Sequence, residues 1–130
     1  MLERLLIELN DQFNFPFTEK DKDGFYCLNV EAFKLKILPL DPGFYVTCFL
    51  APVPNADDLA DPDVFYSHIT QANYLGQGTG RNTIAVSENG KEFHLCRFHP
   101  YETAYQTFED ILERFVNFAE YWQTHLKTQQ

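Results

Sequence analysis

The chain has 130 residues with 10 Lys or Arg and 19 Asp or Glu, so its formal net charge at pH 7 is −9. Hydrophobic residues make up 45% of the chain and aromatic residues 16%, which is too apolar for a disordered acidic tail. The shortage of cationic residues argues against a nucleic-acid-binding protein, because affinity for phosphates depends on clustered Lys and Arg. The length favours a single domain spanning residues 1–130.

Targeting and redox features indicate a cytoplasmic protein. The longest apolar stretches, such as residues 48–53, are much shorter than the ~20 residues of a membrane span, so we expect no membrane interaction. The N-terminus lacks the basic and apolar regions of a secretory signal. Cys27, Cys48 and Cys96 fall in strand-like runs without the spacing of a disulfide framework, so we expect reduced, packed thiols.

The first half of the chain predicts one helix followed by three strands. Apolar residues at helical spacing predict a helix over residues 2–13, and a polar segment over residues 14–24 predicts a loop. Strands are predicted over residues 25–30, 33–37 and 44–51. The last of these is apolar enough to be buried on both faces or to be covered by a partner protein.

The second half predicts a helix, a hairpin and a longer helix. Asp61 followed by Pro62 is a typical helix start, with Gly76 as a stop. Asn89-Gly90 between alternating runs predicts a hairpin of residues 83–87 and 92–98. Residues 103–106 fit a capping box, and apolar residues then recur at helical spacing as far as Leu126. The order α-βββ-α-ββ-α predicts an α+β fold with a twisted, mostly antiparallel sheet packed against helices.

No set of residues predicts a metal, a cofactor or a catalytic centre. His94, Cys96 and His99 are ligand types, but a structural zinc site takes four ligands and no fourth stands nearby in sequence. Residues 19–24 resemble the start of a calcium loop, yet the position of the bidentate Glu is occupied by Val30. The Gly-rich segment 76–80 follows a helix and enters a strand, so no helix N-terminus is available for a phosphate. We therefore expect no cofactor and no enzymatic activity.

The amount of apolar surface is unusual for a chain of this size. Three amphipathic helices and two-sided apolar strands exceed what one sheet face can cover. The excess is expected as exposed patches that bind another protein. The alternative is an aromatic-rich core with nothing left over, and composition does not separate the two.

Several stretches resemble the class I type III secretion chaperones, the Tir-chaperone or CesT-like family. The resemblance covers nearly the whole chain and includes its size, acidity and element order. It rests on Asn73-Tyr74-Leu75, the Gly-rich loop that follows, Ile84-Ala85-Val86, Phe93-His94-Leu95 and the amphipathic end from Phe108 to Trp122.

The resemblance implies a dimeric, non-enzymatic virulence chaperone that keeps a secreted effector soluble and secretion-competent in the bacterial cytoplasm. It would hold the N-terminal segment of the effector in extended form along hydrophobic grooves, and its partner subunit would be identical or a related chaperone. By the resemblance, the dimer interface would comprise Val64, Phe65, His68, Ile69, Ala72, Ile84 and Val86. The effector-binding residues would be Leu2, Leu5, Leu9, Tyr26, Leu28, Phe33, Leu35 and Phe44.

Two alternatives stay open at this point. The same fold could serve a regulatory or adaptor protein that binds a folded partner, or an α+β domain that binds a small molecule in a pocket between helix and sheet. An extended segment is favoured on physical grounds, because it can add a strand to an open sheet edge and place alternate side chains in pockets.

Overall fold

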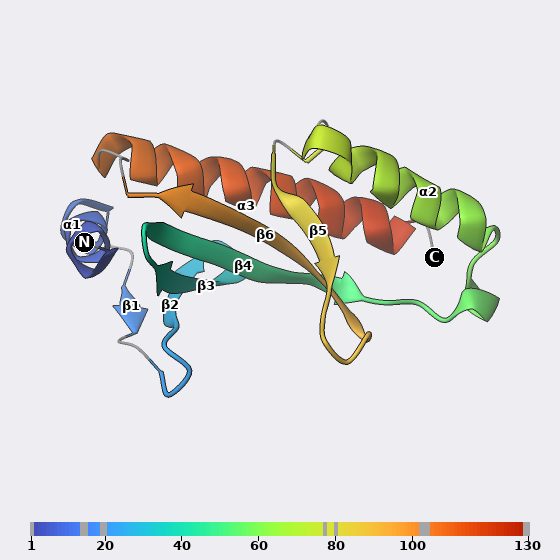
Figure 1. The fold of residues 1–130 in the computed structure, drawn as a ribbon, viewed down its shortest axis with the longest axis horizontal. Coiled ribbons are helices and arrows are strands. Elements are labelled where there is room, and N and C mark those ends of the chain that lie inside the picture. The colour runs from blue at the N-terminus through green and yellow to red at the C-terminus, as the bar shows by residue number, and fades with distance from the viewer. Residues whose placement is uncertain are drawn as a thin grey trace.

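A six-stranded sheet and three α-helices form the part of the chain that the structure describes (Figure 1). The computed structural model describes residues 2–13, 16–18, 21–76, 78–79, 81–101 and 105–128. The strand order is β1-β2-β3-β4-β6-β5, and every neighbouring pair is antiparallel. The predicted α+β class with an antiparallel sheet is confirmed.

The predicted order of elements is confirmed with one addition. The elements are α1 (Leu2–Phe13), β1 (Phe17–Thr18), β2 (Tyr26–Val30), β3 (Phe33–Leu40), β4 (Gly43–Pro52), α2 (Pro62–Asn73), β5 (Thr83–Val86), β6 (Glu92–Pro100) and α3 (Tyr105–Thr128), with 3₁₀ turns at Ala56–Asp58 and Tyr74–Gly76. The added strand, β1, lies in the predicted loop and pairs with Leu28 and Cys27 of β2. Its two residues are too few to give a periodic signal.

Local signals in the sequence explain where α2 begins and ends. The Asp61 carboxylate accepts hydrogen bonds from the backbone N–H groups of Asp63 and Val64, as an N-cap should. The α-helix ends at Asn73, and the following turn closes at Gly76, whose φ of +70° suits glycine. The predicted capping box at residues 103–106 lies outside the residues described in full.

Strand β3 runs three residues beyond its predicted end, to Leu40. The prediction stopped at Ile37 because the clean alternation of apolar and polar residues ends there. Pro39, two residues further on, cannot donate a ladder hydrogen bond. In the structure the pairing of β2 with β3 ends at Tyr26 and Ile37, so Pro39 pairs only with Phe44 of β4. Pro39 therefore sits where β3 has a partner on one side, which is where a sheet tolerates proline.

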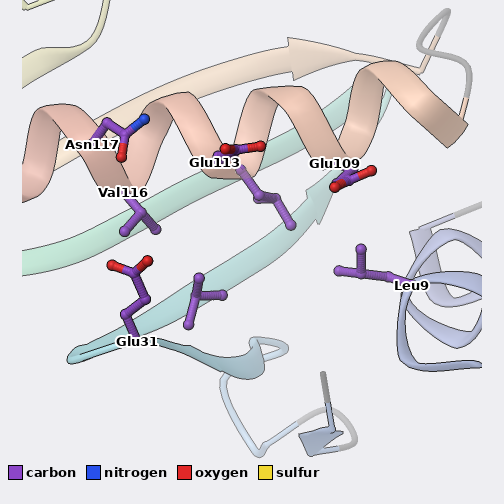
Figure 2. Close-up of a pocket in the computed structure, with 8 residues that line it drawn as sticks. Leu9, Glu31, Glu109, Glu113, Val116 and Asn117 are labelled. Carbon is purple, nitrogen blue, oxygen red and sulfur yellow. The ribbon is translucent and has the colours of Figure 1, made fainter. Parts of the chain in front are cut away.

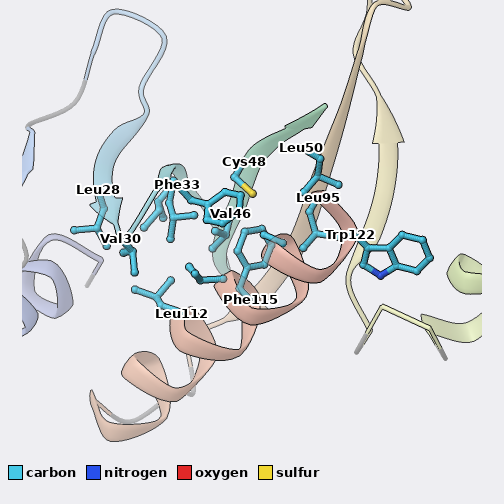
Figure 3. Packing of buried hydrophobic residues seen from close by; sticks show 14 of the residues in the cluster. Leu28, Val30, Phe33, Val46, Cys48, Leu50, Leu95, Leu112, Phe115 and Trp122 are labelled. Carbon is cyan, nitrogen blue, oxygen red and sulfur yellow. The ribbon is translucent and has the colours of Figure 1, made fainter. Parts of the chain in front are cut away.

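The core lies between one face of the sheet and the helices. Phe44, Val46, Cys48 and Leu50 alternate along β4 and are buried on this inner face. The ring centroids of Phe44 and Phe108 of α3 lie 5.3 Å apart in an edge-on arrangement. The ring centroids of Phe65 of α2 and Phe93 of β6 lie 6.1 Å apart. Figure 3 shows the same packing from β2 across to Trp122. Helices α1 and α2 lie at opposite ends of α3 (Figure 1).

Candidate functional site

All eight side chains predicted to bind the effector lie in the buried core. Leu2, Leu5 and Leu9 of α1 pack toward the rest of the core, and the strand residues all belong to the inner face. These strand residues are Tyr26, Leu28, Phe33, Leu35 and Phe44. Contact between an effector and these side chains stays a prediction. Leu9 lines a cleft, and contact with the other seven would require the core of the free chain to open.

The predicted dimer interface divides into buried and exposed residues. Phe65, Ile69, Ala72 and Ile84 are buried within the chain. The other three residues face outward: Val64, which is 60% exposed, His68 and Val86. Of the seven, these three are open to a partner in the isolated chain, and the interface itself stays a prediction.

A surplus of exposed apolar side chains is present, but on other residues than those predicted to bind the effector. Nine large hydrophobic side chains are exposed among the described residues: Ile7, Leu40, Phe49, Val64, Tyr66, Tyr74, Val86, Phe98 and Tyr121. Of the fifteen residues predicted to bind a partner, Val64 and Val86 are among them. Most of the exposed apolar side chains are therefore not those that the resemblance assigned to a partner, and that assignment stays a prediction.

Part of this surplus lies on the outer face of the sheet, the face opposite α3. The pairing of β4 with β6 sets Phe49 beside His94, Thr47 beside Cys96 and Tyr45 beside Phe98. Phe49 is 43% exposed, and Phe98 is exposed to a similar extent. Of the two expectations for β4, burial on both faces is not seen in the isolated chain, because the helices pack on its inner face. Coverage of its outer face by a partner stays a prediction.

The two edges of the sheet differ in how readily an added strand could pair with them. At the β5 edge, the side-chain amide of Asn73 hydrogen-bonds to both backbone groups of Ile84. At the opposite edge, β1 pairs with only two of the five residues of β2. An added strand therefore has fewer obstacles at the β1–β2 edge than at β5.

A cleft of about 270 Å³ opens between α1, the turn after β2 and α3. Its lining combines aliphatic and acidic side chains, together with Asn117 (Figure 2). The aliphatic residues are Leu9, Val30, Leu112 and Val116, and the acidic residues are Glu31, Glu109 and Glu113. The sequence did not reveal this cleft, because Glu109 and Glu113, four residues apart on one helix, carry no sign of the distant segments that pack beside them.

The histidine and cysteine side chains do not converge on a metal site. Among the described residues, no group of three or more His, Cys, Asp or Glu side chains is placed to hold a metal ion. His94 and Cys96 share the outer face with their β4 partners, whereas His99 pairs with Phe44 on the inner face. The rejected zinc ligands thus lie on opposite faces of the sheet.

The three cysteines are free. Burial, together with the neighbouring Cys96, raises the pKa of the Cys48 thiol to about 12. Cys48 is therefore protonated at neutral pH, and a protonated buried thiol is a poor nucleophile. The Sγ atom of Cys96 lies 3.5 Å from the hydroxyl oxygen of Thr47, within hydrogen-bonding range for sulfur.

A cluster of His and aromatic side chains joins the end of α3 to α2. Nε2 of His125 lies 3.3 Å from Nδ1 of His68, and both imidazole rings contact Trp122. Burial, and to a lesser degree the charge of His68, lowers the pKa of His125. His68 is exposed.

No helix of the described residues has both the length and the apolar character needed to cross a membrane.

Comparisons with known proteins assign the family. The family model of the Tir chaperone protein (CesT) family matches residues 4–123. A protein of Chlamydia pneumoniae is 28% identical over 129 residues, which cover 97% of this chain and 96% of the relative.

Solved structures share the fold at low sequence identity. A chain of the ExsC–ExsE complex superposes with a TM-score of 0.73 at 18% identity, covering 96% of this chain and 92% of its own. A chain of the HopA1–SchA chaperone–effector complex gives 0.70 at 14% identity, covering 95% and 93%. A chain of the heterodimeric ExoU–SpcU complex, from the type III secretion system of Pseudomonas aeruginosa, gives 0.66 at 15% identity, covering 97% and 94%. The resemblance found in the sequence is confirmed, and the chain belongs to the Tir chaperone protein (CesT) family of type III secretion chaperones.

Proposed function

We propose that this chain is a type III secretion chaperone that binds the N-terminal segment of a secreted effector in extended form and keeps it soluble for export. The observation that carries the proposal is the family match over residues 4–123. The chain acts by binding, without a catalytic step, in the cytoplasm of the bacterium that makes the effector.

The geometry of the sheet supports an extended cargo. An unfolded segment gains main-chain hydrogen bonds by joining a sheet edge, and its alternate side chains then need apolar sites. On the side of β2 that faces away from β3, β1 pairs with Leu28 and Cys27, whereas at the other edge of the sheet Asn73 hydrogen-bonds to both backbone groups of Ile84. The outer face adds apolar surface beside the strands, at Phe49 and Phe98.

The chain also forms a dimer in this proposal, through the exposed part of the predicted interface. Val86 pairs with Phe93, whose ring contacts Phe65 of α2, so Val86 lies near the start of that helix. Val64, beside Phe65 in sequence, faces outward. An isologous contact through these residues would use the same patch on both subunits. A related chaperone with a similar patch would form a heterodimer.

Co-expression with each secreted effector of the same bacterium tests the proposal. The full-length effector and its N-terminal segment alone are expected to co-purify with the chain, whereas an effector lacking that segment is not. Amide hydrogen exchange of the bound segment should show protection only where it pairs with the sheet. Retention of binding after deletion of the N-terminal segment would instead support an adaptor that binds a folded partner.

A further inference from the structure

The cleft between α1 and α3 combines two properties that point to one kind of ligand. Its apolar floor is formed by side chains from three separate elements: Leu9 from α1, Val30 from β2, and Leu112 and Val116 from α3. Its rim carries the carboxylates of Glu31, Glu109 and Glu113, and none of the residues lining it is cationic. Figure 2 shows these carboxylates around the aliphatic side chains.

The three carboxylates have no ion-pair partner among the described residues. The close contacts between acidic and basic side chains in that part of the chain are Arg4–Glu8, at 3.5 Å, and His94–Glu92, at 3.2 Å. Glu109 and Glu113 are also like charges four residues apart on α3, an arrangement that destabilises a helix. The stability of α3 therefore does not explain why Glu109 and Glu113 occupy these two positions.

The position of Glu31 is also unfavourable for the local backbone. Glu31 and Ala32 form the two-residue turn between β2 and β3, since Val30 pairs directly with Phe33. The φ of Glu31 is +55°, a left-handed conformation in which Gly, Asn or Asp is usual. A glutamate here costs stability in the turn and adds a third carboxylate to the cleft.

The volume of the cleft limits what it can hold. About 270 Å³ is slightly below the ~300–1,000 Å³ of small-molecule pockets, and an amphipathic helix needs an extended groove instead. It suits one aliphatic side chain with the adjoining backbone. The location suits an extended segment, because Val30 is the last residue of β2, the strand beside the more open sheet edge.

We propose that this cleft binds an aliphatic side chain flanked by Lys or Arg residues in the cargo segment. The inference rests on the proposed function and specifies the chemistry of its ligand. The aliphatic side chain packs between Leu112 and Val116, and the flanking cations pair with Glu31, Glu109 and Glu113. The net charge of −9 reinforces the attraction for a basic segment at low ionic strength.

Synthetic peptides provide the first test. The probe is a fluorescently labelled Gly/Ser peptide with one Leu between pairs of Lys, and the measurement is fluorescence anisotropy with the full chain. Two comparison peptides replace the Leu by Ser or every Lys by Glu. Binding of the Leu/Lys peptide and weak or no binding of the others is expected. Equal affinity for the Lys and Glu peptides, or for the Leu and Ser peptides, overturns the proposal.

Variants of the chain locate the binding site. The double variant Glu109→Gln/Glu113→Gln should bind the Leu/Lys peptide about tenfold more weakly, at about threefold for each carboxylate at the rim of the cleft. The control Asp57→Asn/Asp58→Asn removes the same charge from exposed residues of the loop before α2 and should change affinity less than about twofold. An equal loss in both double variants would mean that net charge alone attracts the peptide.

Glu31→Asn separates binding from folding. Asn tolerates the left-handed conformation better than Glu, so this variant should melt at the same or a higher temperature and yet bind the peptide more weakly. Unchanged affinity in this variant and in Glu109→Gln/Glu113→Gln would overturn the site.

The N-terminal segment of the effector distinguishes this inference from the proposed function. If the wild-type chain captures no effector segment, the proposed function fails. If it captures the segment and the Glu109→Gln/Glu113→Gln variant does so with equal affinity, the function stands and the acidic cleft is not the docking site.

Discussion

The side chain of Asn73, at the end of α2, replaces a neighbouring strand for Ile84 of β5. Its Nδ2 donates a hydrogen bond to the carbonyl oxygen of Ile84, and the N–H of Ile84 donates one to its Oδ1, each at 2.9 Å. β5 is the last strand of the sheet on this side. The amide thus satisfies backbone groups that would otherwise be open to pairing with another chain.

Replacing Asn73 by Ala should lower the free energy of unfolding by about 1–3 kcal/mol, because two partly buried backbone groups lose their partners. Urea unfolding measures the change. Light scattering should also detect larger species, since the β5 edge becomes able to pair with other chains. The control Gln71→Ala alters an exposed residue of the same helix and should leave both measurements unchanged. Equal stability of the two variants would contradict the bridging role.

The α1 stripe is tested by a buried and an exposed residue of the same helix. Leu9 is 1% exposed and Ile7 is 46% exposed. Leu9→Ala should cost about 2–5 kcal/mol of unfolding free energy, as for a core leucine, and Ile7→Ala less than about 1 kcal/mol. A Leu9→Ala variant with wild-type stability but weaker effector binding would show instead that the stripe serves as a groove.

Adjacent residues of α2 distinguish dimerisation from folding. Phe65 is buried, so Phe65→Asp should abolish folding by placing a charge in the core. Val64→Asp should preserve the circular dichroism spectrum and raise the dissociation constant of the dimer by about 30-fold or more, because each copy contributes the charge. Analytical ultracentrifugation measures the constant. A Val64→Asp protein that dimerises as tightly as wild type would exclude Val64 from the interface.

The buried imidazole of His99 predicts lower stability at mildly acidic pH. Burial, with a smaller effect of Arg97, lowers the pKa of His99 from 6.5 to about 4. Its Nε2 is buried without a hydrogen-bond partner among the described residues, and its ring stacks on Phe44. Between these two pKa values the unfolded chain binds a proton that the folded chain does not, so the free energy of unfolding falls as the pH is lowered through this range.

The expected loss is about 2 kcal/mol between pH 7 and pH 5, measured by urea unfolding at each pH. His99→Leu removes the titrating group and should flatten most of this dependence. A smaller slope should remain, because the pKa of His125 is also lowered. The same slope in wild type and in His99→Leu would show that the protonation of His99 is not linked to folding.

Elements specified by short-range chemistry were predictable from the sequence. The Asp61 cap, the Asn89-Gly90 hairpin and the apolar stripes of α1 and α3 depend on residues a few positions apart, and these elements lie where they were expected. The end of β3 was not predictable, because Pro39 is tolerated only where β2 has already ended. Strand β1 is defined by its pairing with β2 rather than by a pattern of its own.

The candidate binding surfaces were harder to predict, because the pattern of an apolar stripe does not specify which segment or partner packs against it. The stripe of α1 carries the same pattern whether it packs on its own sheet or on a cargo. Similarly, Glu109 and Glu113 look like ordinary solvated residues of a helix until Val30 and Leu9 are brought beside them.

The sequence by itself determined most of the secondary structure, the acidic charge and the family resemblance, since these depend on composition and on local spacing along the chain. The tertiary structure alone decided which face of the sheet the helices cover, which leucines are core residues and where the carboxylates of Glu31, Glu109 and Glu113 meet. The physical reason is that burial and charge proximity arise from contacts between distant segments, and a periodic pattern specifies a face without specifying its partner.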